Sequence, residues 1–185
     1  MVHVIRVKDS EGHIAVGGFR DVRVDSVDSL LKMVRDTSGG TDFQIFNSQY
    51  IAGYKHIVYA ALNAIAAFNS GAGVSKSVSM ESMLYAACQD QISGAIELLG
   101  LKQGVHNVAL LVFGVTHEKT KKDFMSIASI LGVADDTVLE VDTVKNSLIM
   151  DAYDVSSVEL DAVGHKEDAL TWVLVERGTL LRAHR

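Results

Sequence analysis

The segment Gln49–Phe68 constrains the fold more than any other part of the sequence, because it has the spacing of one long helix with two different faces. One face is apolar and carries Ile51, Tyr54, Val58, Leu62 and Ile65. The opposite face carries an imidazole among small residues: His56, Ala60, Ala64 and Ala67. A helix of this kind is typical of an element packed between two layers. We therefore expect this helix at the centre of the fold.

Strands and further helices are predicted on both sides of this segment. The expected strands are Val2–Lys8, Ile14–Phe19, Phe43–Phe46 and Val108–Val115, with 9–12 as a hairpin loop between the first two. The last of these is continuously apolar, which is typical of a strand buried on both faces. Six further helices are expected. The first is capped by Asp25 or Ser26 and runs to Arg35, the second runs from Ser79 to about Ala87, and the third begins near Asp90 and ends at Gly100 in a left-handed conformation. The other three are Phe124–Leu131, Thr143–Tyr153 and Glu167–Leu181. Within the last segment, Leu170–Val175 could instead be a strand.

The composition is that of one globular domain spanning 1–185, with 48% hydrophobic and 22% charged residues. The single cysteine, Cys88, cannot form an intrachain disulfide, which favours a reducing compartment. No signal peptide and no run of about 18 apolar residues is visible, so we expect a cytoplasmic protein without a membrane segment. The formal net charge of -6 argues against sequence-blind coating of nucleic acid, although it leaves room for a local basic contact.

The loop Gly71–Ser77 has some features of a phosphate-binding loop. A P-loop needs glycine directly before its lysine and another glycine five residues earlier, and here these positions hold Ser75 and Ser70. The loop also follows a predicted helix rather than a strand. We interpret it as a glycine cap and connector. Two alternatives stay open: a small-molecule or phosphate-binding domain that uses this loop, and a loop whose Lys76 and Ser77 present donors to a partner's phosphate.

No residues form a recognised metal or catalytic pattern, so we expect no catalytic residue, no metal and no cofactor. The seven histidines contain no His-x-x-x-His pair. The acids Asp135, Asp136, Glu140 and Asp142 lack the EF-hand pattern and are best explained as solvated. His56 is more readily explained as a hydrogen-bonded core residue than as a ligand contact. An enzyme that uses His56 and Glu81, on consecutive helices, remains a further hypothesis.

Basic residues gather in four places along the chain. These are Lys55 with His56; Lys76; His117 with Lys119, Lys121 and Lys122; and Arg177 with Arg182 and Arg185. Each alone is typical of solvated surface. An RNA-binding patch would need two of them to converge, beside an aromatic side chain such as Tyr54 or Tyr59 on which a base could stack.

Several motifs occur in an order that points to one family. Tyr50–His56 has a Gly-x-x-His helix opening, and Ala60, Ala64 and Phe68 follow at the spacing of an alanine-rich helix. Ser79–Ala87, Gln91–Ile96, Leu99-Gly100 and Leu174–Arg177 complete the series. In this order and spacing, Asn47–Gly100 resembles the small regulatory, kinase-binding subunit of the KEOPS complex, found in archaea and eukaryotes. The chain departs from that family after Arg177, where Gly178-Thr179 replaces an Ala-Leu-Leu-type run.

The resemblance implies an α/β fold of the α+β type, with a small, mainly antiparallel sheet flanked by helices. It also implies a subunit without catalysis that binds the small lobe of the kinase-like ATPase of KEOPS. That complex helps to install threonylcarbamoyl on the adenosine beside the anticodon of ANN-decoding tRNAs, and the family is associated with capture of the tRNA acceptor end.

Carried onto this sequence, the resemblance implies two sets of site residues. The candidates for RNA contact are Lys55, His56, Lys76 and Ser77. The candidates for the kinase-facing surface are Ile92, Ile96 and Leu99. For the second set a core role is equally consistent with the spacing, because a stripe at helical spacing is often core. Docking predicts instead an exposed apolar patch of several hundred Å².

Overall fold

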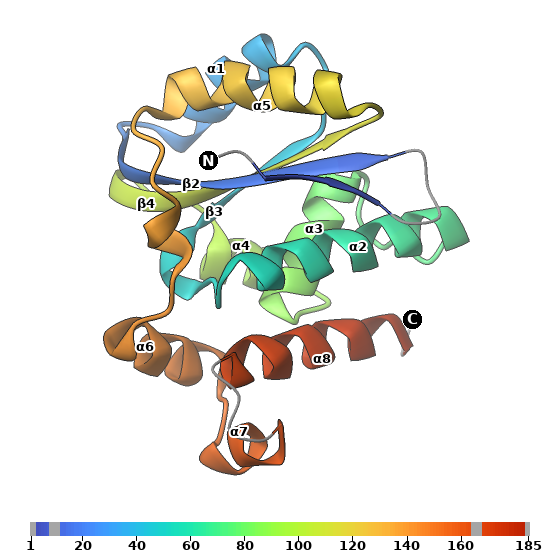
Figure 1. Cartoon of the computed structure of the whole chain (residues 1–185), viewed down its shortest axis with the longest axis vertical. Coiled ribbons are helices and arrows are strands. Elements are labelled where there is room, and N and C mark those ends of the chain that lie inside the picture. Colours follow the sequence, from blue (N-terminus) through green and yellow to red (C-terminus); the bar gives the residue numbers. More distant parts are fainter. Residues whose placement is uncertain (1–2, 8–11, 164–167, 184–185) are drawn as a thin grey trace. The chain divides into compact units, whose positions relative to one another are not determined.

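A computed structural model describes residues 3–7, 12–163 and 168–183, with the side chains of 182 and 183 set aside (Figure 1). It contains one four-stranded antiparallel sheet accompanied by helices, which confirms the predicted α+β class. The chain divides into two compact units. The sheet unit comprises Met1–Ser48 and Gly100–Val138, and the helical unit comprises Gln49–Leu99 and Leu139–Arg185. That 1–185 forms a single domain therefore stays a prediction.

The sheet has the strand order β1-β2-β4-β3. Its strands are β1 (His3–Arg6), β2 (His13–Val24), β3 (Phe43–Asn47) and β4 (Gly104–Gly114). β4 lies between β2 and β3, which explains why its apolar run is continuous and why both of its faces are buried. The ends of the predicted strand 2–8 and most of the predicted hairpin loop lie outside the described residues.

β2 is longer than predicted because it continues through a bulge after Phe19. At the bulge Asp21 has a φ of 54°, and its N–H donates to Asn107 Oδ1 on β4 at 3.0 Å. Asn and Asp tolerate this left-handed conformation better than most residues. The extra residue breaks the apolar alternation, so the pattern alone places the strand end too early.

Helices α1 (Val27–Ser38) and α5 (His117–Leu131) pack against each other beside one face of the sheet (Figure 1). Ser26 caps α1 through Ser29 N–H, which decides between the two predicted caps. Thr116 caps α5 through Lys119 N–H, so this helix begins a full two turns before the predicted Phe124. The core here includes Ala15, Phe19, Val34, Ile45, Leu110, Val112, Phe124 and Ile127.

The helical unit contains α2 (Tyr54–Ser70), α3 (Val78–Ala87), α4 (Ile92–Leu99), α6 (Thr143–Tyr153), α7 (Ser157–Val163) and α8 (Ala169–Ala183). Short 3-10 turns lie at Ser48–Tyr50 and Asp136–Leu139. Three predictions need correction. α2 begins at Tyr54 rather than near Gln49, Ser77 rather than Ser79 caps α3, and Gly100 does not have a left-handed conformation. Leu170–Val175 lies in a helix, which confirms the helix predicted for this segment over the strand alternative.

The alanine face of α2 is its most deeply buried side. Ala61, Ala64 and Ala67 are fully buried, whereas Tyr54, Leu62 and Ile65 on the predicted apolar stripe are half-buried. α2 packs against α3 and α8. Small side chains let helix backbones approach closely, so the alanines mark the tightest packing in this unit.

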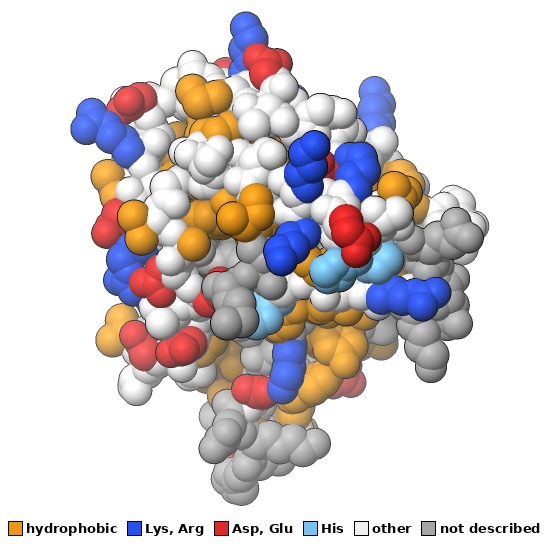
Figure 2. All heavy atoms as spheres, turned by 45° about the horizontal axis from the view of Figure 1, so that its top comes forward, with side chains coloured by type: hydrophobic (Ala, Val, Ile, Leu, Met, Phe, Trp, Pro, Cys, Tyr) orange, Lys and Arg blue, Asp and Glu red, His pale blue; other side chains and the backbone are white. Residues whose placement is uncertain are grey.

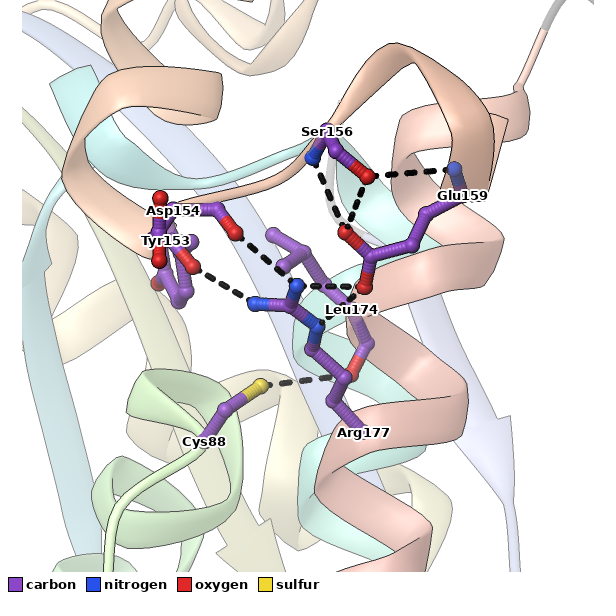
Figure 3. A network of polar contacts seen from close by, with 7 residues as sticks. All are labelled: Cys88, Tyr153, Asp154, Ser156, Glu159, Leu174 and Arg177. Carbon is purple, nitrogen blue, oxygen red and sulfur yellow. Dashed lines mark hydrogen bonds and ion pairs between the residues drawn. The ribbon is translucent and has the colours of Figure 1, made fainter. Parts of the chain in front are cut away.

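Arg177 holds α8 to the end of α6 and to α7 (Figure 3). Its guanidinium donates to the carbonyl oxygens of Tyr153 and Asp154 and forms an ion pair with Glu159. Donation from Ser156 N–H and from Arg177 lowers the pKa of Glu159 to about 2. Arg177 is therefore a structural residue. Of the other C-terminal basic residues, Arg185 and the side chain of Arg182 lie outside the described residues.

Gly178 lies where α8 meets the end of α3. A Cβ atom at this position would lie only 2.7 Å from the carbonyl oxygen of Tyr85, a backbone atom that cannot move alone. Glycine is therefore required at the place where the sequence departs from the Ala-Leu-Leu-type run. The close approach of α8 to α3 explains this departure.

We expect Gly178→Ala and Gly94→Ala to change stability in opposite directions. Helix propensity alone favours alanine at both positions by about 1 kcal/mol. At Gly178 the clash with Tyr85 should outweigh this and destabilise the protein by about 1–3 kcal/mol. At Gly94 the new Cβ meets only the end of the Gln89 side chain, which can move away. Urea unfolding of both variants measures the two signs, and stabilisation by Gly178→Ala would contradict the predicted packing.

Candidate docking and nucleic-acid surface

His56 is a buried core residue that joins α2 to the end of α3. Its Nδ1 accepts the N–H of Ala52 at 3.1 Å, and its Nε2 donates to the carbonyl oxygen of Ala86 at 3.0 Å. Burial lowers the pKa of His56 to about 4, so the ring is neutral at pH 7. The Gly-x-x-His motif has a structural role at the start of α2. Gly53 is the N-cap at φ 90° and has no side chain to cap the helix, and His56 instead accepts the N–H of Ala52 just before it. The structure thus favours the core interpretation over direct RNA contact.

The loop Gly71–Ser77 already holds an anionic group of its own. Glu81 is fully buried, and its Oε2 accepts the N–H groups of Val74 at 3.1 Å and Ser75 at 2.9 Å. Converging backbone N–H groups are the donors that a phosphate loop offers to its ligand. Because Glu81 occupies two of these donors, the loop is not an open phosphate cradle.

Because His56 and Glu81 are both sealed from solvent, the hypothesis of an enzyme that uses this pair is not supported. A general acid or base has to come within hydrogen-bond reach of its substrate.

Lys76 and Ser77 have different environments although they are neighbours. Lys76 is exposed at the end of the loop. Ser77 caps α3: its Oγ accepts the N–H of Met80 at 3.2 Å and shares a hydrogen bond with Ser79 Oγ at 3.0 Å. Lys76 can reach a partner from this position, whereas the hydroxyl of Ser77 is already used by the helix.

Lys55 belongs to a cluster that we call the Trp172 platform, formed by Lys55, Tyr59, Asp168 and Trp172. Lys55 Nζ pairs with Asp168 Oδ2 at 2.5 Å and lies 5.7 Å from the centre of the Trp172 ring. The hydrogen bond and charge of Asp168 raise the pKa of Lys55. The rings of Tyr59 and Trp172 lie 5.4 Å apart, and Tyr59 is exposed. Trp172 is half-buried. A cation beside accessible aromatic rings is an arrangement on which unpaired bases can stack.

The structure does not bring Lys55 and Lys76 together. Lys55 lies in the first turn of α2, whereas Lys76 lies in the loop that follows its last turn, and the 17 residues of α2 span about 26 Å. Tyr59 was predicted as a possible stacking residue beside Lys55, whereas Trp172 and Asp168 were not predicted. Only the packing of α8 against α2 reveals these two, because they are more than 100 residues from Lys55 along the chain.

On α4 the three predicted kinase-facing residues separate into two kinds. Ile92 and Ile96 are 41% and 45% exposed and lie four residues apart on one face, and we call them the α4 pair. Leu99 is fully buried, which agrees with the core role left open for it. The α4 pair is available to a partner, whereas the side chain of Leu99 is not.

A second exposed apolar row lies on and before α6 and was not predicted. It consists of Val141, Val144 and Leu148 at helical spacing, and we call it the α6 row. A signal existed in the sequence, since these residues recur at i, i+3 and i+7. That periodicity is typical of a face turned to the core, so it could not show that this face is exposed.

Of the four acids considered as a cation site, Glu140 is exposed and the other three have structural partners. Asp135 pairs with Arg20 at 2.6 Å, Asp136 accepts the N–H of Gly18 at 3.0 Å, and Asp142 caps α6 through Lys145 N–H. Within the described part of the chain, no three His, Cys, Asp or Glu side chains are grouped as a metal site would require.

The sequence matches the model of one family, described as "Kinase binding protein CGI-121", over residues 19–175. The chain belongs to this family. It is also 32% identical over 117 residues to the "Regulatory protein Cgi121" of Methanocaldococcus jannaschii, with 63% of this chain and 72% of that protein covered. The predicted family is therefore confirmed.

The match to the CGI-121 family includes the α4 pair, the α6 row and the Trp172 platform, since all of these lie between residues 19 and 175. The family name assigns kinase binding, and it does not say which surface binds. Among the helices that the structure describes, none is long and apolar enough to cross a membrane.

We expect Glu81→Ala to destabilise the protein by about 3 kcal/mol, because two loop N–H groups lose their acceptor in a buried site. Glu81→Gln retains an acceptor oxygen of the same shape and should cost about 1 kcal/mol. Urea unfolding gives both values, and amide exchange at Val74 and Ser75 reports the two hydrogen bonds directly. If Glu81→Ala leaves both stability and amide exchange unchanged, Glu81 does not hold this loop.

Proposed function

We propose that this chain is a non-catalytic, cytoplasmic subunit that binds the kinase-like ATPase of the KEOPS complex and helps to recruit tRNA for threonylcarbamoylation beside the anticodon. The match to the kinase-binding CGI-121 family over residues 19–175 carries the proposal. The name of the archaeal relative, a regulatory protein, supports a role in controlling another protein. The buried positions of His56 and Glu81 agree with a protein that works through its surface.

The α4 pair is the surface that we assign to the kinase-like partner. Both isoleucines expose much of their side chains, and an exposed apolar pair on one helix face gains free energy when a partner covers it. The α6 row is the alternative surface for the same partner, because it has the same apolar character. Point variants on each helix can distinguish the two.

The RNA role is assigned to the Trp172 platform and Lys76. The platform combines a cation with two aromatic rings, and Lys76 adds an exposed cation in the loop between α2 and α3. A single strand following α2 could contact both, with bases stacked at the platform and phosphates near the lysines. In the free protein Lys55 forms an ion pair with Asp168, so Asp168 should compete with an RNA phosphate for the Lys55 ammonium group.

The alternative of a phosphate-binding domain built on Gly71–Ser77 has less support. Two of its backbone donors are bound to Glu81, and the Ser77 hydroxyl caps α3. A phosphate would have to displace a buried carboxylate to reach these donors.

Changing both residues of the α4 pair to glutamate should weaken binding to the kinase-like ATPase by at least about 100-fold. Each isoleucine contributes about 2 kcal/mol when it is buried, which corresponds to roughly a 30-fold change. The affinity can be measured by calorimetry or gel filtration of the mixed proteins. The matched comparison is Val144→Glu with Leu148→Glu on the α6 row.

If only the α6 variant loses binding, the docking surface lies on α6 rather than on α4. If neither variant loses binding, both surface assignments are wrong. If the unaltered protein shows no binding to the kinase-like ATPase, the proposed partner itself is wrong.

Lys55→Glu and Lys76→Glu should each weaken tRNA binding, and each should lower the slope of log K against log salt by about 0.7–0.9, the value for one phosphate contact. Asp168→Asn should strengthen binding, because it frees Lys55. The measurement is a filter-binding or anisotropy titration at several salt concentrations. Lys102→Glu, on the exposed surface of the sheet unit, is the charge-matched control.

Equal losses for Lys102→Glu and the two site variants would show that only overall charge matters. Unchanged binding in Lys55→Glu and Lys76→Glu would place the RNA surface elsewhere.

A further inference from the structure

One flank of α5 carries two kinds of side chain in a single row, which we call the α5 strip. The row consists of His117, Lys121, Met125, Ala128 and Gly132, at helical spacing along the whole helix. Lys121 makes its first half cationic, with the imidazole of His117 beside it, and its second half is apolar or small. Neither the proposed kinase contact nor the proposed RNA contact uses these residues.

The cationic half lies over a row of sheet residues with matching character. Arg6 on β1, His13 on β2 and Gly114 on β4 are direct neighbours across the antiparallel ladder, so they share one face of the sheet. A Cβ at Gly114 would meet Thr120 of α5, which identifies this as the face that α5 covers. The rings of His13 and His117 lie 6.2 Å apart, edge to face.

This cationic end has unused capacity for hydrogen bonds. His13 Nδ1 is buried and has no hydrogen-bond partner among the described residues. Arg6 and Lys121 are exposed and form no ion pair among the described residues. His117 Nδ1 lies 3.7 Å from Glu118 Oε1. A buried polar atom without a partner in a cationic setting indicates a place for a ligand or an ordered water.

The apolar half of the strip covers a cavity of about 440 Å³. Gly17, Gly18 and Phe19 of β2 line one side, and Phe124, Met125 and Ala128 of α5 line the other. The volume falls within the range of sites for small molecules. The polar residues at the wall are Ser129 and Asp136. Asp136 Oδ1 accepts the N–H of Gly18, and its Oδ2 lies 3.7 Å from His3 Nε2.

The cavity and the cationic end are near neighbours. Met125 follows Lys121 by one helical turn, about 6 Å, and Gly17 follows His13 by four strand residues, about 14 Å. On the face seen in Figure 2, Lys, Arg and His side chains gather beside exposed hydrophobic ones. A single small ligand can therefore have an apolar part in the cavity and an anionic part at the cations.

We propose that the α5 strip binds a nucleoside monophosphate, with its phosphate at Arg6, His13 and Lys121 and its base in the cavity beside Phe124. Arginine, lysine and imidazole N–H groups are the donors that phosphate attracts, and a flat base fits between apolar walls. The carboxyl group of Asp136 at the wall accepts hydrogen bonds, so the site should prefer a base with an amino group. This site belongs to the sheet unit, whereas the loop Gly71–Ser77, for which phosphate binding is an open alternative, belongs to the helical unit.

The test is a calorimetric titration of the full chain with AMP, IMP, adenosine and inorganic phosphate. AMP should bind at least about ten-fold more tightly than adenosine or phosphate alone, because one charge-assisted contact contributes that much. IMP lacks the amino group and should bind more weakly than AMP, and Asp136→Asn should remove that difference. If a short single-stranded RNA competes with AMP, the natural ligand of the site is a nucleotide within RNA. If it does not compete, the natural ligand is a free nucleotide.

Lys121→Glu should weaken AMP binding at least about ten-fold, whereas Lys32→Glu on α1 should leave it unchanged. Both side chains are exposed, so neither change should prevent folding. Ser129→Trp fills the cavity from its rim and should abolish the preference for AMP over inorganic phosphate. Equal binding of AMP and inorganic phosphate, no measurable AMP binding, or equal effects of the two lysine variants would each overturn the proposal.

Discussion

The carbonyl oxygen of Ala86 is the point on which the helical unit depends. It accepts hydrogen bonds from His56 Nε2 at 3.0 Å and from the Tyr153 hydroxyl at 3.0 Å, and both donors are buried. Helix ends leave carbonyl oxygens without partners, and in a dry interior such a group has to be satisfied by a side chain. This oxygen therefore links α2, α3 and α6 in one arrangement.

Close packing around that point limits which residues can be used. The fully buried alanines of α2 and the glycine at 178 let backbones come close, and Gly178 leaves no room for even a Cβ beside Tyr85. Arg177, one residue earlier, uses its guanidinium on the carbonyl oxygens of Tyr153 and Asp154. The Leu-Val-Glu-Arg segment and the glycine after it are thus explained by the docking of α8, without any role in chemistry.

Much of the fold could be predicted from the sequence, because it depends on local patterns. The apolar run of β4, the bounds of α6 and the start of α1 at Asp25 or Ser26 are all properties of neighbouring residues. The candidate site could be predicted only in part. Lys55 and the α4 pair follow from helical spacing, but Trp172 and Asp168 reach Lys55 only through the packing of α8 on α2. Spacing also could not separate the exposed Ile92 and Ile96 from the buried Leu99.

The residues with the most reactive chemistry turn out to be internal. His56, Glu81 and Arg177 are each bonded to backbone groups, and burial raises the pKa of the Cys88 thiol to about 12, where it is not a nucleophile at pH 7. Beside exposed charged residues such as Lys76, Asp90 and Glu97, the helical unit presents isoleucines on α4, valines and a leucine on and before α6, and an aromatic cluster with a lysine. Such surfaces gain free energy from being covered by a partner.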